Sequence, residues 1–168
     1  MSFISPTKVI LMNTKSEIRQ KLRESLDLHV LGWELKLSIA AVAVALAIPG
    51  VMGGFRDPSY WIMVAVVSGL TLLPLFGYAL WLVNKIFREV ESYSFYSAKL
   101  TMPHGSKFVR GGLYFTVLLE DPDGGKFVVN TRSIFAPNGI SPLRLEDYLN
   151  KTVTIAYNEE TEMVLVLE

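Results

Sequence analysis

The chain has no cysteine and only two histidines, His29 and His104. The absence of cysteine excludes a disulfide framework, a thiolate metal site and a cysteine nucleophile. Neither histidine has a second ligand three or four positions away, so the spacing of a zinc motif is missing. The sequence also lacks a Gly-x-Ser-x-Gly nucleophile elbow and a Walker loop. We therefore expect no catalytic residues, no bound cofactor and no metal site.

Charge is scarce and balanced. The 16 lysines and arginines equal the 16 aspartates and glutamates, and charged residues make up 19% of the 168 residues, below the roughly 25% typical of a soluble domain. The isoelectric point of about 6.7 argues against nucleic acid as the main partner, because such proteins carry a basic patch at a high isoelectric point. The mean hydropathy of +0.35 is high, so the placement of the apolar residues decides the class.

Two long stretches contain no charged residue. Trp61–Val83 is one of them, and as a helix it is about 34 Å long, enough for a hydrocarbon core of ~30 Å. Leu37–Phe55 is the other; it is rich in alanine and therefore a weaker candidate. The short link between them contains Pro58 and favours an antiparallel return. The sequence predicts a two-helix transmembrane hairpin over residues 33–84, with spans at about 35–55 and 60–84.

The distribution of lysine and arginine predicts the orientation of this hairpin. The connecting turn carries only Arg56, whereas cations cluster on both outer sides of the spans. Those cations are Lys8, Lys15, Arg19, Lys21, Arg23 and Lys36 before the first span, and Lys85, Arg88 and Lys99 after the second. The positive-inside rule then places both termini in the cytoplasm of a multi-pass cell-membrane protein. We expect no cleavable signal peptide, because the first twelve residues lack a charged segment followed by a sufficient apolar run.

Residues 1–32 are predicted to be a cytoplasmic N-terminal region with an amphipathic helix over 14–31. Thr14 and Glu17 have capping-box spacing. Apolar residues then recur every four positions, at Ile18, Leu22, Leu26 and Val30. Two interpretations stay open: the helix lies on the inner membrane surface, or it packs on its own C-terminal domain or continues into the first span.

Residues 85–91 are predicted to be a helical linker, and residues 92–168 a cytoplasmic β domain. Alternating β-branched and aromatic runs mark about five strands. The segment Asp121–Gly125 contains the Asp-Gly pair of a tight hairpin, and Ser141-Pro142 has the sequence of a helix start. The fold class is therefore an α+β membrane protein. Its C-terminal part is expected to be a small antiparallel β-barrel or rolled sheet with one short helix.

Two sets of residues are candidate contact sites. Ala41 with Ala45, and Ala65 with Gly69, have the small-xxx-small spacing that lets helices approach closely. We favour packing within the hairpin over a face for another subunit. Lys107 and Arg110 lie in the glycine-rich, basic segment 104–112 and are candidate contacts for a lipid headgroup or another anion. That segment lacks the strand–loop–helix setting of a phosphate site, so a plain hairpin is favoured there.

The leading functional hypothesis is a non-enzymatic, membrane-anchored cytoplasmic β module. It would bind a protein partner as a subunit, regulator or neutraliser of a membrane complex. One alternative is a subunit of a small oligomeric channel or transporter whose hairpins form a membrane ring, although no Asp, Glu, Lys, Arg or His lies between Leu37 and Phe55 or between Trp61 and Val83. A second alternative is a lipid-acting membrane enzyme that uses the 104–112 loop. The expected partners are the lipid bilayer and a protein or second copy of the chain, with no nucleic acid.

Overall fold

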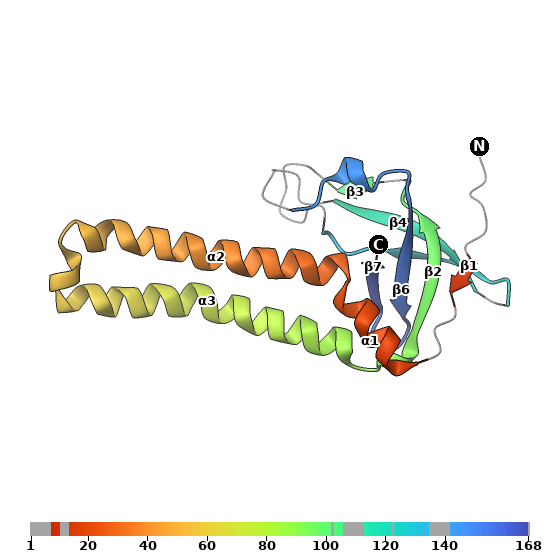
Figure 1. Cartoon of the computed structure of the whole chain (residues 1–168), viewed down its shortest axis with the longest axis horizontal. Helices are drawn as coiled ribbons and strands as arrows, with labels where there is room; N and C mark the ends of the chain where they lie inside the picture. The colour runs from red at the N-terminus through yellow and green to blue at the C-terminus, as the bar shows by residue number, and fades with distance from the viewer. Residues whose placement is uncertain are drawn as a thin grey trace. The chain divides into compact units, whose positions relative to one another are not determined.

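The computed structural model describes residues 8–10, 14–101, 103–105, 113–121, 123–134 and 142–167. Within them the chain is α+β, with three α-helices and two antiparallel sheets (Figure 1). It divides into two compact units. The first unit is Met1–Val30 with Lys85–Glu168, and the second is Leu31–Asn84.

The larger sheet belongs to the first unit and has the strand order β1-β2-β6-β7. These strands are β1 (Lys8–Ile10), β2 (Tyr93–Lys99), β6 (Thr152–Asn158) and β7 (Met163–Leu167). All neighbours are antiparallel, with Phe95 opposite Ala156 and Ile155 opposite Val166. The predicted strands near the C-terminus are confirmed, whereas β1, which precedes the predicted helix over 14–31, was not anticipated.

The smaller sheet has the order β3-β4-β5, formed by β3 (Pro103–Gly105), β4 (Leu113–Glu120) and β5 (Lys126–Asn130). The predicted turn between β4 and β5 is confirmed. Asp121 N–H donates to Gly125 O at 2.7 Å, and Gly124 N–H donates to Asp121 O at 2.9 Å. Gly124 has a φ of +81°, a conformation that glycine adopts without the strain of a Cβ.

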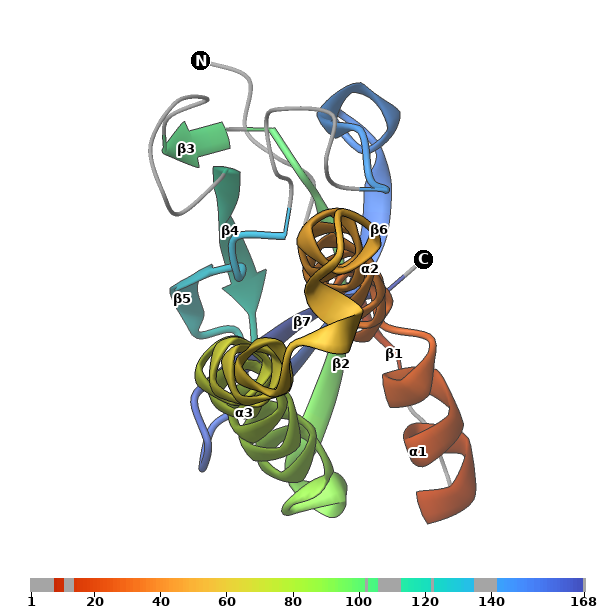
Figure 2. The same cartoon turned by 90° about the vertical axis from the view of Figure 1, so that its left-hand side faces the viewer.

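Within the described residues the two sheets share one hydrophobic core but do not close into a barrel. Of the predicted barrel or rolled sheet, the barrel is therefore wrong, and two separate sheets take its place. Phe115 and Leu119 of β4 lie in the same buried cluster as Ile155 of β6 and Val166 of β7, and Figure 2 shows β3, β4 and β5 grouped apart from β2 and β6. Closure would require a hydrogen-bonded strand along each outer edge. At β7 a side chain takes that place instead, because Asp27 accepts from the Val166 N–H.

The number of strands and the short helix also differ from the prediction. Within the predicted β domain, residues 92–168, the described residues form the six strands β2 to β7 rather than about five. The predicted helix is a single 3-10 turn, η3 (Leu145–Asp147), while Ser141 lies outside the described residues. Asn150 then takes a φ of +63° and Lys151 N–H donates to Tyr148 O. The chain therefore leaves the turn directly into β6 before a full helix can form.

The predicted helix over 14–31 is broken into two helices, α1 (Lys15–Arg23) and α2 (Leu26–Val51). Thr14 Oγ1 accepts from Glu17 N–H at 3.4 Å, which caps α1, and Ser25 Oγ accepts from Leu28 N–H at 3.5 Å at the start of α2. Ile18 and Leu22 are buried, and α1 contacts β7 and the 3-10 turn η2 (Val90–Ser92). Of the two open interpretations, packing on the C-terminal domain is therefore the one observed for α1.

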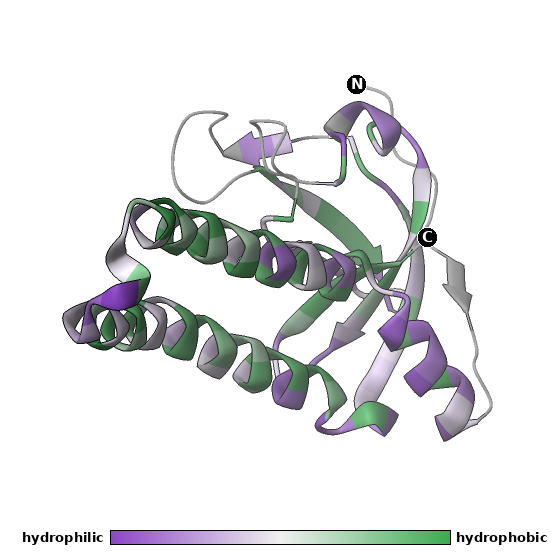
Figure 3. Cartoon of the chain, turned by 60° about the vertical axis from the view of Figure 1, so that its left-hand side comes forward, coloured by the Kyte–Doolittle hydropathy of each residue, from purple (hydrophilic) through white to green (hydrophobic). Residues whose placement is uncertain are grey.

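The second unit contains most of α2, the 3-10 turn η1 (Gly54–Arg56) and most of α3 (Pro58–Phe87). Both long helices are apolar and long enough to cross a membrane, and Figure 3 shows α3 hydrophobic along most of its length. At the turn, Tyr60 Oη donates to Leu46 O at 2.6 Å, and the Phe55 and Tyr60 rings meet edge to face. Gly53 has a φ of +116° there.

Candidate functional site

A buried carboxylate joins the start of α2 to the edge of the larger sheet. Asp27 is 3% exposed, and its Oδ2 accepts from the Val166 N–H at 3.2 Å. Its Oδ1 lies 3.8 Å from Arg132 Nε and has no hydrogen-bond partner among the described residues. Burial raises the pKa of Asp27 to about 6, although Arg132 and the Val166 amide act in the opposite direction. This arrangement covers an open strand edge with a titratable group.

A tyrosine hydroxyl lies within electrostatic reach of that carboxylate. Burial raises the pKa of Tyr93, the first residue of β2, to about 12, and the Asp27 carboxylate adds to this increase. Tyr93 therefore stays protonated at neutral pH and is a hydrogen-bond donor rather than a base. The Thr161 side chain acts in the opposite direction and lowers the pKa of Tyr93.

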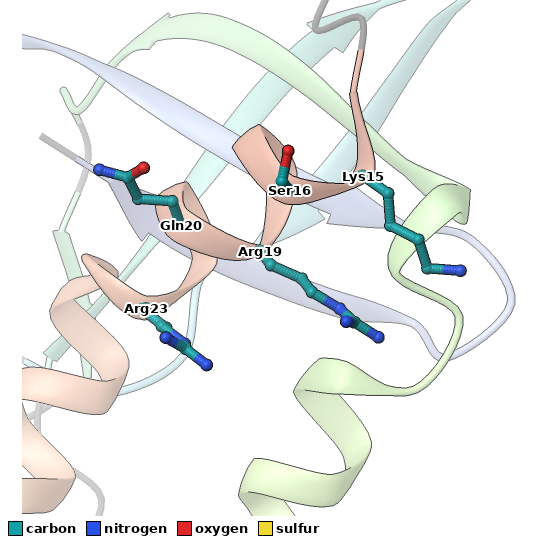
Figure 4. Close-up of a pocket in the computed structure, with 5 residues that line it drawn as sticks. All are labelled: Lys15, Ser16, Arg19, Gln20 and Arg23. Carbon is teal, nitrogen blue, oxygen red and sulfur yellow. The ribbon is translucent and has the colours of Figure 1, made fainter.

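The exposed side of α1 is basic. Lys15, Arg19 and Arg23 recur every four residues and are exposed, and we call these three residues the basic side of α1. Together with Ser16 and Gln20 they line an open hollow of about 480 Å³. Figure 4 shows the three cationic side chains extending from one side of the helix. Of these three cations, Lys15 alone forms an ion pair within the described residues, since its Nζ lies 2.7 Å from Glu91 Oε1.

The outer face of the β4–β5 hairpin exposes apolar side chains. Leu118 and Val128 lie opposite each other in register and are 41% and 62% exposed. The other members of this face are Thr116, Glu120, Lys126 and Asn130, and we call the six residues the β4–β5 outer face. In the described part of the chain β5 is an end strand of its sheet. The hairpin therefore combines an apolar pair with a strand edge.

The predicted helix-packing residues lie on the two long helices and are mostly exposed. Ala41, Ala45 and Ala65 are exposed, and Gly69 is half-buried. A Cβ built on Gly69 would meet one atom within 4 Å, Leu73 Cδ1 at 4.0 Å, which belongs to the same helix. The hairpin does not bring these four residues together in a buried interface.

The other candidates from the sequence lie outside the described residues or stand alone. Lys107 and Arg110 lie outside the described residues. His29 is exposed, and the exposed His104 ring stacks on Tyr114 with 5.7 Å between ring centres. Across the described ranges, no three His, Cys, Asp or Glu side chains are grouped so that they could hold a metal ion.

Sequence reasoning missed both Asp27 and the β4–β5 outer face. A signal for Asp27 was present, because the residue lies beside Leu26 in the apolar stripe of the predicted helix. A carboxylate at such a position requires a buried partner. Arg132 could not be found from the sequence, since it lies more than a hundred positions away. The exposure of Leu118 and Val128 depends on the strand register, because a shift of one residue moves side chains to the other face of the sheet.

Comparison of the chain with protein-family models, with curated proteins and with solved structures found no match. Function is therefore inferred from the chain's own residues.

Proposed function

We propose that the chain is a non-enzymatic, membrane-anchored β module that binds a protein partner through the β4–β5 outer face. The hairpin of α2 and α3 is the anchor, with spans at about 35–55 and 60–84. Both termini and the β domain lie in the cytoplasm, as the cluster of lysine and arginine outside the spans favours. The module acts as a subunit or regulator of a membrane complex.

Exposure of the long helices supports the membrane anchor. Within the most apolar window of each helix, only 6% of the residues are buried. Leu70, Leu73 and Leu80 of α3 are each more than 70% exposed. In water, each large apolar side chain left exposed would forgo about 1.5–3 kcal/mol of transfer free energy. A lipid environment removes this penalty, and soluble proteins rarely expose such continuous apolar surface.

The Leu118–Val128 pair is the observation that supports a protein partner. Both side chains point away from the core formed by Val117, Leu119 and Val129. An extended segment of a partner could pair with the backbone of β5 and cover this apolar pair, which is the geometry of β-strand addition. Glu120 and Lys126 lie opposite each other beside the pair and would set the polarity of the neighbouring contacts.

Site-specific crosslinking in membranes tests this surface, because the chain has no native cysteine. Single variants Val128→Cys and Thr116→Cys would carry a photo-crosslinker in the full chain, and Glu159→Cys in the exposed β6–β7 turn is the matched control. We expect the two hairpin positions to give one discrete adduct, identified by mass spectrometry as a second protein. Leu118→Glu should abolish the adduct from position 128.

Three results would contradict the proposal. One is the absence of any adduct at the two hairpin positions, and another is an equal yield of the same adduct at position 159. The third is turnover of a substrate by the purified full chain, because it would place the protein among enzymes.

A channel or transporter subunit is the second candidate, and the exposure of the small residues favours it. Ala41, Ala45 and Ala65 are exposed, so these close-approach surfaces are available to helices of another copy. Ion flux through reconstituted vesicles that is lost on Gly69→Leu would support this function. Silent vesicles containing verified oligomers would count against it.

A further inference from the structure

We infer that the basic side of α1 binds the phosphate groups of anionic phospholipids at the cytoplasmic membrane surface. This inference rests on the membrane anchor of the proposed function but is independent of the protein partner. It assigns a ligand class to Lys15, Arg19 and Arg23.

The helix presents its cations in one row. Residues four apart lie on one side of a helix, about 5–6 Å from each other, so the three side chains form a ridge along α1 (Figure 4). Ser16 and Gln20 flank this ridge and line the same hollow, which adds neutral hydrogen-bonding groups. Spaced cations beside polar side chains suit a row of separate phosphate groups.

The apolar side of α1 is not available to the membrane. Ile18 and Leu22 are buried through contacts of α1 with β7 and η2 of the same unit. An amphipathic helix that inserts between lipids needs its apolar side for that purpose. Contact between α1 and lipid would therefore be electrostatic and confined to the headgroups.

The acidic groups near the ridge leave most of its charge uncompensated. Glu91 faces Lys15 at 2.7 Å, and the pKa of the Glu91 carboxyl is lowered by that hydrogen bond, by Lys15 and, more weakly, by Arg19. Glu24 lies 3.9 Å from Lys21, a cation that falls on another side of the helix. Arg23 makes no hydrogen bond or ion pair within the described residues, so at least Arg19 and Arg23 can take a new anion.

The chain itself keeps α1 near the membrane. From Leu26, where α2 begins three residues after Arg23, to residue 35, where the first predicted span begins, the helix is about 14 Å long at ~1.5 Å per residue. The headgroup layer occupies roughly 5–8 Å of that distance, and electrostatic attraction extends about a further 8–10 Å. An anionic lipid surface is therefore within reach, whereas a soluble phosphate compound would have no such enforced proximity.

Energy transfer in vesicles measures this contact. The full-length variant Glu17→Cys, at an exposed position of α1 that does not line the hollow, carries a donor fluorophore. The acceptor is attached to the acyl chain of phosphatidylglycerol or, separately, of phosphatidylcholine. We expect the acceptor on phosphatidylglycerol to be enriched around α1. Each cation near an anionic surface contributes on the order of a fivefold preference, so the double variant Arg19→Gln, Arg23→Gln should reduce the enrichment roughly 25-fold or to the level of phosphatidylcholine.

Lys21→Gln is the control for position, because it removes one cation from the same helix on a different side. It should leave the enrichment within about twofold, whereas each of Arg19→Gln and Arg23→Gln alone should reduce the enrichment about fivefold. Equal losses in the control and the double variant, or no enrichment in the parent, would overturn the inference. Loss of enrichment on adding inorganic phosphate at constant ionic strength would also overturn it by indicating a soluble anion site. If alkaline carbonate strips the parent from vesicles, the membrane anchor fails as well, which distinguishes the two failures.

Discussion

Burial raises the pKa of Asp27 to about 6, so the charge of this carboxyl group changes near that pH. The carboxylate caps the Val166 N–H and faces Arg132 at 3.8 Å, but desolvation outweighs both and raises the pKa of Asp27 from 3.8 to about 6. A group whose pKa is higher in the folded state favours folding in its protonated form. This contribution is fully present below pH ~4 and is lost as the pH rises through about 6.

Asp27→Asn should remove this dependence on pH. Asparagine keeps an oxygen that accepts from Val166 N–H but never carries the buried charge. We expect the variant and the parent to have similar unfolding free energies near pH 4. The variant should become more stable by up to about 3 kcal/mol at neutral pH, since a pKa difference of one unit corresponds to ~1.4 kcal/mol. Denaturant unfolding of the full chain in detergent at several pH values measures the difference.

Asp123→Asn is the control for the loss of one carboxylate, because Asp123 lies in the exposed β4–β5 turn. A difference between Asp27→Asn and the parent that stays constant between pH 4 and 7 would show that burial of Asp27 does not govern its titration.

At the scale of elements, sequence patterns predicted the helix and the turn that depend mainly on neighbouring residues. The uncharged stretch Trp61–Val83 lies within α3, and the Asp-Gly turn joins β4 to β5. The break between α1 and α2 was missed because the four-residue apolar repeat continues through Ser25 unchanged. Barrel closure was wrongly predicted because the edge of β7 is met by Asp27, a contact between residues 139 positions apart. No local pattern carries that information.

The turn between the long helices depends on close packing at Gly54. A Cβ there would lie 2.8 Å from Pro49 O and 2.9 Å from the Tyr60 ring, and the carbonyl can move only with its backbone. Gly54→Ala should therefore destabilise the hairpin by about 1–3 kcal/mol. Gly77→Ala is the control, since its Cβ would meet nothing within 4 Å. Thermal unfolding followed by circular dichroism should show a lower Tm for Gly54→Ala alone, and equal Tm values for both variants would contradict the close packing.

At the scale of the whole molecule, the two units have different roles in the proposed function. The unit Leu31–Asn84 has the length and apolarity of a membrane anchor. The other unit carries the two surfaces that can bind something else: the basic side of α1 and the β4–β5 outer face. We found no catalytic motif in the sequence of this unit. Among the described residues, no three His, Cys, Asp or Glu side chains are grouped so that they could hold a metal ion. Such a module can bind a partner and lipid at the same time, because the two contacts use separate surfaces of one unit.

The sidedness of two labelled positions tests the membrane hairpin most directly. Single cysteines at Arg56, in the turn between the long helices, and at Gly124, in the β4–β5 turn, would be introduced separately into the cysteine-free chain. A thiol reagent that cannot cross membranes should label position 56 in intact cells and label position 124 only after the cells are opened. Labelling of both positions from the same side of the membrane would contradict the hairpin and the cytoplasmic β domain together.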